Sequence, residues 1–400
     1  MAAVKLLMHL LTNGQYGYFR DELYYLACGE HLDWGYPDCA PLIALLAWTG
    51  RHLFGESLQA IRFLPALAGA GMVFMTGLLT RDMGGRGGAI FLACLGVVCA
   101  PIYLISDTLL SMNAFEPLFW TGCLWLVWRA AERGDSHLWI WAGVLAGLGL
   151  ENKHSTAFFL VALAAGILLS GRWRVIRDPW MWAGLGIALL LLLPNLVWQY
   201  LHGWATLELL RNVQRIHKNV ELTPWAFVGQ QVFILLPTSA LVWAAGLWRS
   251  LRRGAGGLRL IGWTYLALLA IMIVMKAKHY YLAPIYPALF AAGGLWWEEL
   301  TPKRWPRRVL AGLIAATGAL FLPMALPVLA PARLVAFQEA LGTAPPKTEV
   351  AHEGPLPQHF GDMFGWPEMV AAVARVWDAL PPADRARAAI LAGNYGEAGA

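Results

Sequence analysis

The sequence predicts an all-α polytopic membrane protein with about eleven transmembrane helices. Three observations point to this class. Of the 400 residues, 58% are apolar and 14% are charged, whereas soluble domains average roughly 45–50% and 25%. The apolar residues form continuous runs, without the alternation of a β-barrel strand. The charges fall in short clusters between these runs. This composition excludes a soluble enzyme, a disordered chain and a nucleic-acid-binding protein.

Each predicted span is an apolar run close to the length that crosses a bilayer. The first is the weakest, because Lys5 and His9 interrupt it and the apolar residues stop before Asn13. Two other segments, 41–54 and 201–224, fit helices that lie on the membrane surface. The predicted spans are residues 3–19, 58–80, 87–106, 113–131, 137–152, 156–171, 180–200, 225–248, 258–276, 280–298 and 308–330.

Basic residues orient the predicted bundle, since every even-numbered span is followed by a basic turn. The positive-inside rule places these turns in the cytoplasm. The odd-numbered exits then face outward, which is the periplasm if the cell is Gram-negative, and we predict a bacterial inner-membrane protein. The basic residues are Arg81, Arg86, Arg129, Arg133, Arg172, Arg174, Arg177, Arg249, Arg252, Arg253, Arg259, Lys303, Arg304, Arg307 and Arg308.

Two domains are expected. Residues 1–330 form the transmembrane domain, with a long outer loop at 20–57. From about residue 331 the composition changes, and helical spacing at 367–380 precedes a short predicted strand at 388–392. These features predict the start of a small α/β domain on the outer face, over 331–400, which we expect to be cut short.

The polar residues outside the basic clusters gather at the odd-numbered exits, on the predicted outer face. Snorkelling to the lipid headgroups is the plain alternative for Arg211 and Lys278, and a helix cap is the plain alternative for Asp21 and Glu22. A carboxylate at membrane depth costs a few kcal/mol unless it is paired or wetted, so we interpret Asp107 and Glu116 as candidates for function. Cys28 and Cys39 can meet in an oxidising compartment.

Several strings resemble glycosyltransferase family 39. This GT-C family includes the dolichyl-phosphate-mannose–protein mannosyltransferases and the aminoarabinose transferases, and the chain looks most like its bacterial branch. The specific string is YGYFRDELYYLACGEHLDWGYPDCAPL, which begins at Tyr16. The others are LLSMNAFEPLFW at 109–120, LGLENKHS at 148–155, LHGWATLELLR at 201–211, KHYYLAPIYPAL at 278–289, HFGDMFGWPEMV at 359–370 and ILAGNYGEAGA at 390–400.

The resemblance implies a membrane-embedded inverting transferase that takes a sugar from a polyprenyl phosphate on the non-cytoplasmic face. The general base of the family is matched here by Asp21. One departure is Asn113, where many members carry an aspartate, and it puts a carboxylate-bound metal in doubt. No His or Cys spacing indicates a metal site either, so we expect no required cofactor and leave a divalent metal as an unsupported alternative.

Sugar transfer from a polyprenyl phosphate itself requires carboxylates and cations, independently of the resemblance. A carboxylate must take the proton of the acceptor, and cations must hold the departing phosphate. We predict Asp21 as the catalytic base. Glu22 is the second catalytic candidate, although it points about 100° away on a helix and is better suited to a structural or acceptor-side role. The predicted phosphate ligands are Lys153, His154, Lys278 and Arg211. The predicted substrate contacts are Tyr24, Tyr25, Glu116, Asp107, Asn113, His202, His279 and Tyr280.

Two functions compete at this point. The first is transfer of a sugar from a polyprenyl-phosphate donor to a lipid, glycan or protein acceptor. The second is transport or flipping of a lipid-linked sugar, which commonly involves inverted repeats and charges at mid-membrane. The sequence contains no internal repeat, and its ionisable residues collect at one face, which favours the enzyme. Membrane lipids are the other expected partners, and nucleic acid is not one.

Overall fold

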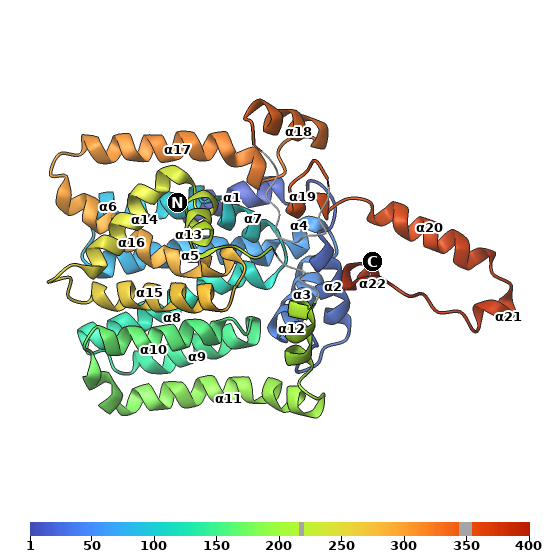
Figure 1. The fold of residues 1–400 in the computed structure, drawn as a ribbon, viewed down its shortest axis with the longest axis horizontal. Coiled ribbons are helices and arrows are strands. Elements are labelled where there is room, and N and C mark those ends of the chain that lie inside the picture. The colour runs from blue at the N-terminus through green and yellow to red at the C-terminus, as the bar shows by residue number, and fades with distance from the viewer. Residues whose placement is uncertain (216–219, 344–353) are drawn as a thin grey trace.

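The structure, a computed structural model, describes residues 1–215, 220–343 and 354–400. These residues form a bundle of helices and contain no β-strand. Most of the long helices run side by side along the horizontal axis of Figure 1. Among them, α9 packs on α11 and α8, α14 on α16, and α10 on α15. The helices of the bundle are α1 (Ala2–Thr12), α5 (Phe63–Asp82), α6 (Gly87–Cys99), α7 (Pro101–Thr108), α8 (Met112–Arg133), α9 (Leu138–Asn152), α10 (Thr156–Leu169), α11 (Pro179–Leu201), α13 (Pro224–Ile234), α14 (Ala240–Leu251), α15 (Leu258–Val274), α16 (Tyr286–Leu300) and α17 (Trp305–Ala325).

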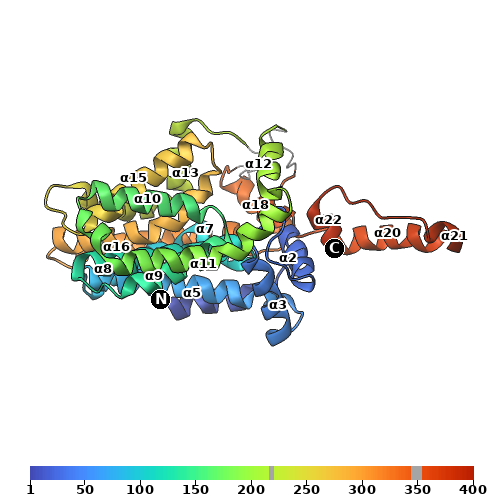
Figure 2. The same ribbon diagram turned by 90° about the horizontal axis from the view of Figure 1, so that it is seen from below.

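Smaller helices gather at one end of the bundle, on the right in Figures 1 and 2. This end contains the loop that follows α1 and much of the chain after α17. Its helices are α2 (Arg20–Glu30), α3 (Leu42–Phe54), α4 (Leu58–Ile61), α12 (Ala205–Arg215), α18 (Pro331–Ala340), α19 (Gln358–Gly361) and α22 (Tyr395–Gly399). Separate helices are therefore present at 41–54 and within 201–224, where the sequence predicts interfacial helices.

The five basic turns lie together at the opposite end. Ion pairs and hydrogen bonds connect these turns directly. The Arg172 guanidinium pairs with Glu132, and Arg249 pairs with Glu299 at 2.9 Å. The backbone N–H of Arg86 donates to Glu298 at 2.7 Å. The basic turns predicted to share one side of the membrane thus share one end of the bundle.

Two of the predicted spans are broken. The helix predicted at 87–106 divides into α6 and α7, which meet at 61°. The reason is Pro101, which has no N–H for the helix and holds Ala100 in an extended conformation. The helix predicted at 225–248 divides into α13 and α14 at 99°. Pro237 follows this second break, and Leu236 has a φ of +74°.

The predicted number of spans is not reproduced by helix length and composition. Three continuous helical segments of the described chain are long and apolar enough to cross a membrane: Leu58–Asp82, Pro179–Leu201 and Trp305–Ala325. The number rises to 5 if each bent pair counts as one span. Several other predicted spans are present as shorter apolar helices, including Thr156–Leu169 and Leu258–Val274.

The first helix is shorter than predicted, because α1 ends at Thr12 instead of residue 19. Asn13 caps the helix, and its side-chain amide donates to the carbonyl of Arg62 at 3.0 Å. The two residues that interrupt the apolar run face inward, since Lys5 and His9 are both fully buried. Lys5 forms an ion pair with Asp107 at 3.0 Å.

The C-terminal segment is only partly as predicted. The helix expected at 367–380 is present as α20 (Trp366–Ala379), and it extends away from the bundle in Figures 1 and 2. The strand expected at 388–392 is wrong. These residues have no regular structure, because the described part of the chain offers no strand to pair with them, and Leu391 is 97% exposed.

Candidate functional site

The outer loop is fixed to the bundle by a buried ion pair between Glu22 and Arg62. The guanidinium donates to both carboxylate oxygens, at 2.8 and 2.7 Å. The same carboxylate accepts the backbone N–H groups of Phe19 and Leu110, at 2.8 and 2.9 Å. Both side chains are completely buried. The carboxylate of Glu22, a residue predicted as catalytic, therefore already accepts hydrogen bonds from all of these donors. It has no access to a substrate.

Asp21 lies one residue before Glu22 in the first turn of α2, and its side chain remains 24% exposed. The Nε of Arg20 lies 3.4 Å from its carboxylate. The hydroxyl of Tyr395 donates to the same carboxylate at 2.9 Å. Tyr395 belongs to α22, so the C-terminal segment of the chain covers the predicted base.

The electrostatic surroundings of Asp21 hold its pKa above the ordinary value. Burial is the main cause, because it disfavours the charged carboxylate. The charge of Arg20, the hydroxyl of Tyr395 and the charge of Lys278 lower the pKa in part. A carboxylate with a raised pKa is a stronger base than an ordinary one.

A second group of polar side chains surrounds Lys153, just after α9. Its ammonium group donates to the side-chain oxygen of Asn113 at 2.8 Å and pairs with Glu116 at 3.1 Å. The Ser155 hydroxyl donates to the other oxygen of the Glu116 carboxylate. Glu116 is 2% exposed and Lys153 is 11% exposed. The sequence predicted Lys153 as a phosphate ligand, and Asn113 and Glu116 as substrate contacts. The structure brings these three residues into direct contact.

The segment between α15 and α16 contacts the Lys153 group. It also carries Lys278, whose charge lowers the pKa of Asp21 in part. The Lys153 ammonium lies 4.0 Å from the ring centroid of Tyr281, and the Tyr281 ring contacts the Tyr280 ring at 5.0 Å. The neighbouring His279 has its pKa lowered to about 4, first by burial and then by the charge of Lys278. His279 is therefore neutral near pH 7.

The two tyrosines predicted as a sugar platform pack on α2 beside Asp21. Tyr25 is buried, whereas Tyr24 packs its ring against Tyr395 at 5.2 Å. The Tyr24 hydroxyl donates to Asp38. Only Tyr24 is therefore partly accessible to a substrate.

Cys28 and Cys39 are both buried as free thiols in the cluster below these rings. A hydrogen bond between the two lowers the pKa of Cys28 and raises that of Cys39. The structure thus places the two cysteines together, as the sequence allowed, in the reduced form.

The remaining predicted residues lie elsewhere. Asp107 is wrong as an outer-face substrate contact, because it is completely buried in α7 against Lys5. His154 faces the Asn195 side chain at 3.0 Å. His202 stacks on Trp198 with ring centroids 3.9 Å apart. Arg211 is exposed on α12. In the described chain, no hydrogen bond or ion pair joins any of these four residues to Asp21.

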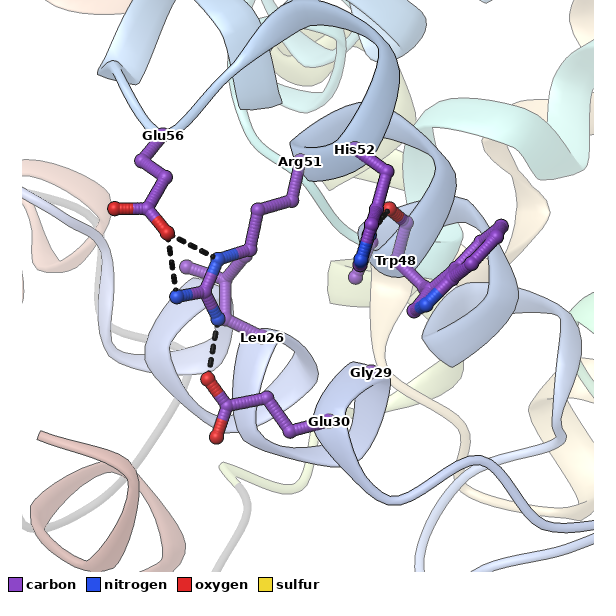
Figure 3. Close-up of a pocket in the computed structure, with 8 residues that line it drawn as sticks. Leu26, Gly29, Glu30, Trp48, Arg51, His52 and Glu56 are labelled. Carbon is purple, nitrogen blue, oxygen red and sulfur yellow. Dashed lines mark hydrogen bonds and ion pairs between the residues drawn. The ribbon is translucent and has the colours of Figure 1, made fainter.

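A pocket of about 420 Å³ lies at the other end of α2, between α2 and α3 (Figure 3). Arg51 bridges the carboxylates of Glu30 and Glu56 across it. Trp48 and His52 stack on the α3 side, with ring centroids 4.3 Å apart. Nine residues of helix separate Glu30 from Asp21, a rise of roughly 13 Å. The pocket offers polar groups and an aromatic face, both of which suit a carbohydrate.

Sequence reasoning missed three residues of the site: Arg62, Tyr281 and Tyr395. Arg62 lies inside the predicted span 58–80, close to its start, where snorkelling to the headgroups is the plain interpretation of an arginine. Tyr281 stands beside the predicted Tyr280 within the family-like string. Tyr395 lies in the string at 390–400 that resembles the family, but nothing in its spacing connects it to residue 21. No group of three or more His, Cys, Asp or Glu side chains in the described ranges has a metal-binding arrangement.

Comparisons with known proteins agree with this picture. Residues 38–198 match a family model described as dolichyl-phosphate-mannose-protein mannosyltransferase, which confirms the resemblance seen in the sequence. The matched region includes Asn113, Glu116 and Lys153 but not Asp21. No curated protein matches the sequence.

Two solved structures have a similar fold. ArnT from Cupriavidus metallidurans, in the apo state, matches with a TM-score of 0.64 at 17% identity, over 95% of this chain and 79% of its own. The Archaeoglobus fulgidus oligosaccharyltransferase, tethered with an acceptor peptide, matches with a TM-score of 0.54 at 13% identity, over 96% of this chain and 58% of its own. The chain therefore shares the fold of these two structures, and its long apolar helices indicate a multi-pass membrane protein.

Proposed function

We propose that this protein is a glycosyltransferase that moves a sugar from a polyprenyl-phosphate carrier to a lipid, glycan or protein acceptor. The observation that carries the proposal is the setting of Asp21. Its side chain is 24% exposed, while its neighbour Glu22 is buried and anchored by Arg62. The buried Glu22–Arg62 pair thus fixes the first turn of α2, which carries Asp21. The family match and the shared fold support the same activity.

Asp21 acts as the general base in this proposal. It accepts the proton of the acceptor hydroxyl or amine as the acceptor oxygen or nitrogen attacks the anomeric carbon. The bond from that carbon to the carrier phosphate breaks, and the electron pair leaves with the phosphate. A single displacement inverts the anomeric centre, whereas retention would need a second carboxylate as nucleophile. Glu22 cannot supply that second carboxylate because it is enclosed.

The departing phosphate needs a cation nearby. We assign this role to Lys278, whose charge acts on the Asp21 carboxylate. Lys153 is already matched by Glu116 at 3.1 Å, so we assign it to holding Asn113, Glu116 and Tyr281 in place. The pocket between α2 and α3 is suited to a part of the acceptor that lies away from the reacting group.

The side of the membrane that the site faces is inferred from the positions of Asp21 and of the basic turns in the bundle. Asp21 lies at the end opposite the five basic turns. If those turns face the cytoplasm, the site faces the outside, which is the periplasm for a protein of the bacterial inner membrane.

The test is turnover by purified protein in lipid, given a panel of polyprenyl-phosphate sugars with lipid, glycan and protein acceptors. Asp21→Asn should lose roughly 10²- to 10⁴-fold in rate while it keeps donor binding. Asp135→Asn, in a basic turn at the far end, is the matched control and should keep wild-type turnover. Turnover by Asp21→Asn within a few-fold of wild type would remove Asp21 from the mechanism.

The bent pairs α6–α7 and α13–α14 are the observation that favours a transporter, since broken helices are common in transporters. The two functions differ in their product. A transferase makes a new glycosidic bond that mass spectrometry detects, whereas a transporter moves the intact lipid-linked sugar between leaflets. Flipping without a new bond in proteoliposomes would support the transporter.

A further inference from the structure

A second pocket lies at the end of the bundle that contains the basic turns, far from Asp21. It has a volume of about 680 Å³ and lies between the start of α6 and the start of α17. Its walls combine arginines, backbone and apolar side chains. The lining residues that matter here are Arg86, Gly87, Phe91, Glu298, Arg304, Arg307 and Arg308.

The charge of this pocket is strongly positive. Four arginines and one glutamate line it, so its formal charge is +4 − 1 = +3. Glu298 is already engaged, because it accepts from the Arg307 guanidinium at 3.0 Å and from the Arg86 backbone N–H at 2.7 Å. In the part of the chain that the structure describes, the guanidinium groups of Arg86, Arg304 and Arg308 have no ion pair.

Two further features favour an anion. The Nε of Arg307 is buried and has no hydrogen-bond partner among the described residues. The N-terminus of α6, a helix of 13 residues, opens at Gly87, where no atom within 4 Å would meet an added Cβ. Unpaired backbone N–H groups and the helix dipole at such a terminus attract negative charge.

We propose that this pocket binds the phosphate headgroup of an anionic phospholipid. Guanidinium groups match phosphate oxygens in geometry and charge, and basic pockets between membrane helices bind such headgroups. Free inorganic phosphate has the same chemistry. The apolar surface beside the pocket favours the lipid, because Phe91 is 48% exposed and Val309 on α17 is 61% exposed. These side chains provide a path for the acyl chains.

The experiment measures lipid retained by the full-length protein after purification and re-exposure to defined lipid. Native mass spectrometry would compare phosphatidylglycerol with phosphatidylcholine. The test variant is Arg304→Gln with Arg308→Gln. The matched control is Arg252→Gln with Arg253→Gln, which removes the same charge from the exposed turn between α14 and α15.

We expect wild type and control to retain phosphatidylglycerol and the pocket variant to bind it about ten-fold or more weakly, since each basic residue near a membrane surface contributes about five-fold. Arg304→Lys with Arg308→Lys keeps the charge and should retain part of the binding, which separates loss of the site from loss of folding.

Three results would overturn the proposal. The first is an equal loss in the pocket variant and in the control, which would mean a general effect of surface charge. The second is equal binding of phosphatidylcholine. The third is displacement of the lipid by inorganic phosphate at millimolar concentration, with equal thermal stabilisation by phosphate alone, which would assign the pocket to a free anion.

Discussion

Arg62 donates to both carboxylate oxygens of Glu22, at 2.8 and 2.7 Å, with both side chains removed from solvent. Arg62 also donates to the carbonyls of Asn13 and Gly17, at 2.9 and 2.8 Å. One side chain therefore ties the end of α1, the following loop and α2 to the bundle. The position of Asp21 depends on this arrangement, because Asp21 is the next residue to Glu22 on the same helix.

Glu22→Gln is expected to lower stability rather than remove a reacting group. The change leaves the Arg62 charge buried without its counter-ion, and breaking a buried pair in this way costs about 3–5 kcal/mol. The thermal unfolding midpoint in detergent would measure the loss.

Glu56→Gln is the control for Glu22→Gln, because Glu56 is 74% exposed in its pair with Arg51 and exposed pairs contribute about 0–1 kcal/mol. A Glu22→Gln variant with unchanged stability and no turnover would make Glu22 a catalytic residue after all.

Much of the fold was predictable from continuous apolar runs, because a run of that kind in lipid must form a helix. The helices at 113–131, 137–152 and 180–200 occur within two residues of their predicted bounds. The breaks were harder to foresee. Proline occurs inside intact helices too, as Pro194 does in α11, so its presence at 101 and 237 does not by itself predict a bend.

The candidate site was predictable where a residue stands out by its own type and position. It was unpredictable where a residue depends on a partner far away along the chain. Asp21, Lys153 and Lys278 stood out as ionisable residues at outer helix ends. The partners of Glu22 and Asp107, which are Arg62 and Lys5, are 40 and 102 residues away along the chain. Pairing of this kind depends on how the helices pack, which apolar patterning does not specify.

Replacing Lys153 should separate a structural role from phosphate binding. Lys153→Met leaves the buried Glu116 carboxylate without its counter-ion, so both stability and donor use should fall. In the double variant Lys153→Met with Glu116→Gln, the charge imbalance is gone and stability should largely return. Thermal unfolding and the donor KM would be measured for all three proteins.

If Lys153 is a supporting residue, the donor KM of the double variant should return toward wild type, whereas Lys278→Ala should keep a raised donor KM with normal stability. A double variant that is stable but still deficient in donor use would return Lys153 to the phosphate site.

The orientation of the bundle can be tested by cysteine labelling of intact cells. Arg253 lies in an exposed basic turn, and Glu208 is exposed on α12. A membrane-impermeant maleimide should label Glu208→Cys and leave Arg253→Cys unlabelled until the cells are opened. The variants would be made in a background without the five native cysteines. Labelling of Arg253→Cys in intact cells would contradict the proposed outer location of Asp21.

The hydrogen bond from Tyr395 to Asp21 should be visible in the pH dependence of turnover. The Tyr395 hydroxyl stabilises the ionised carboxylate and so lowers the pKa of Asp21. Tyr395→Phe removes this effect, and the pKa of Asp21 should rise. Because a general base acts in its deprotonated form, the acid limb of the kcat/KM profile should shift to higher pH, and the rate on the plateau should change less than the rate at low pH.

Tyr24→Phe is the control for this shift. Its hydroxyl donates to Asp38 rather than to Asp21, while its ring retains the packing against Tyr395. The acid limb of Tyr24→Phe should therefore stay at the wild-type pH. An equal loss of rate by Tyr395→Phe at every pH would mean that Tyr395 only holds the C-terminal segment against α2. A shift toward lower pH would contradict the assignment of the acid limb to the Asp21 carboxylate.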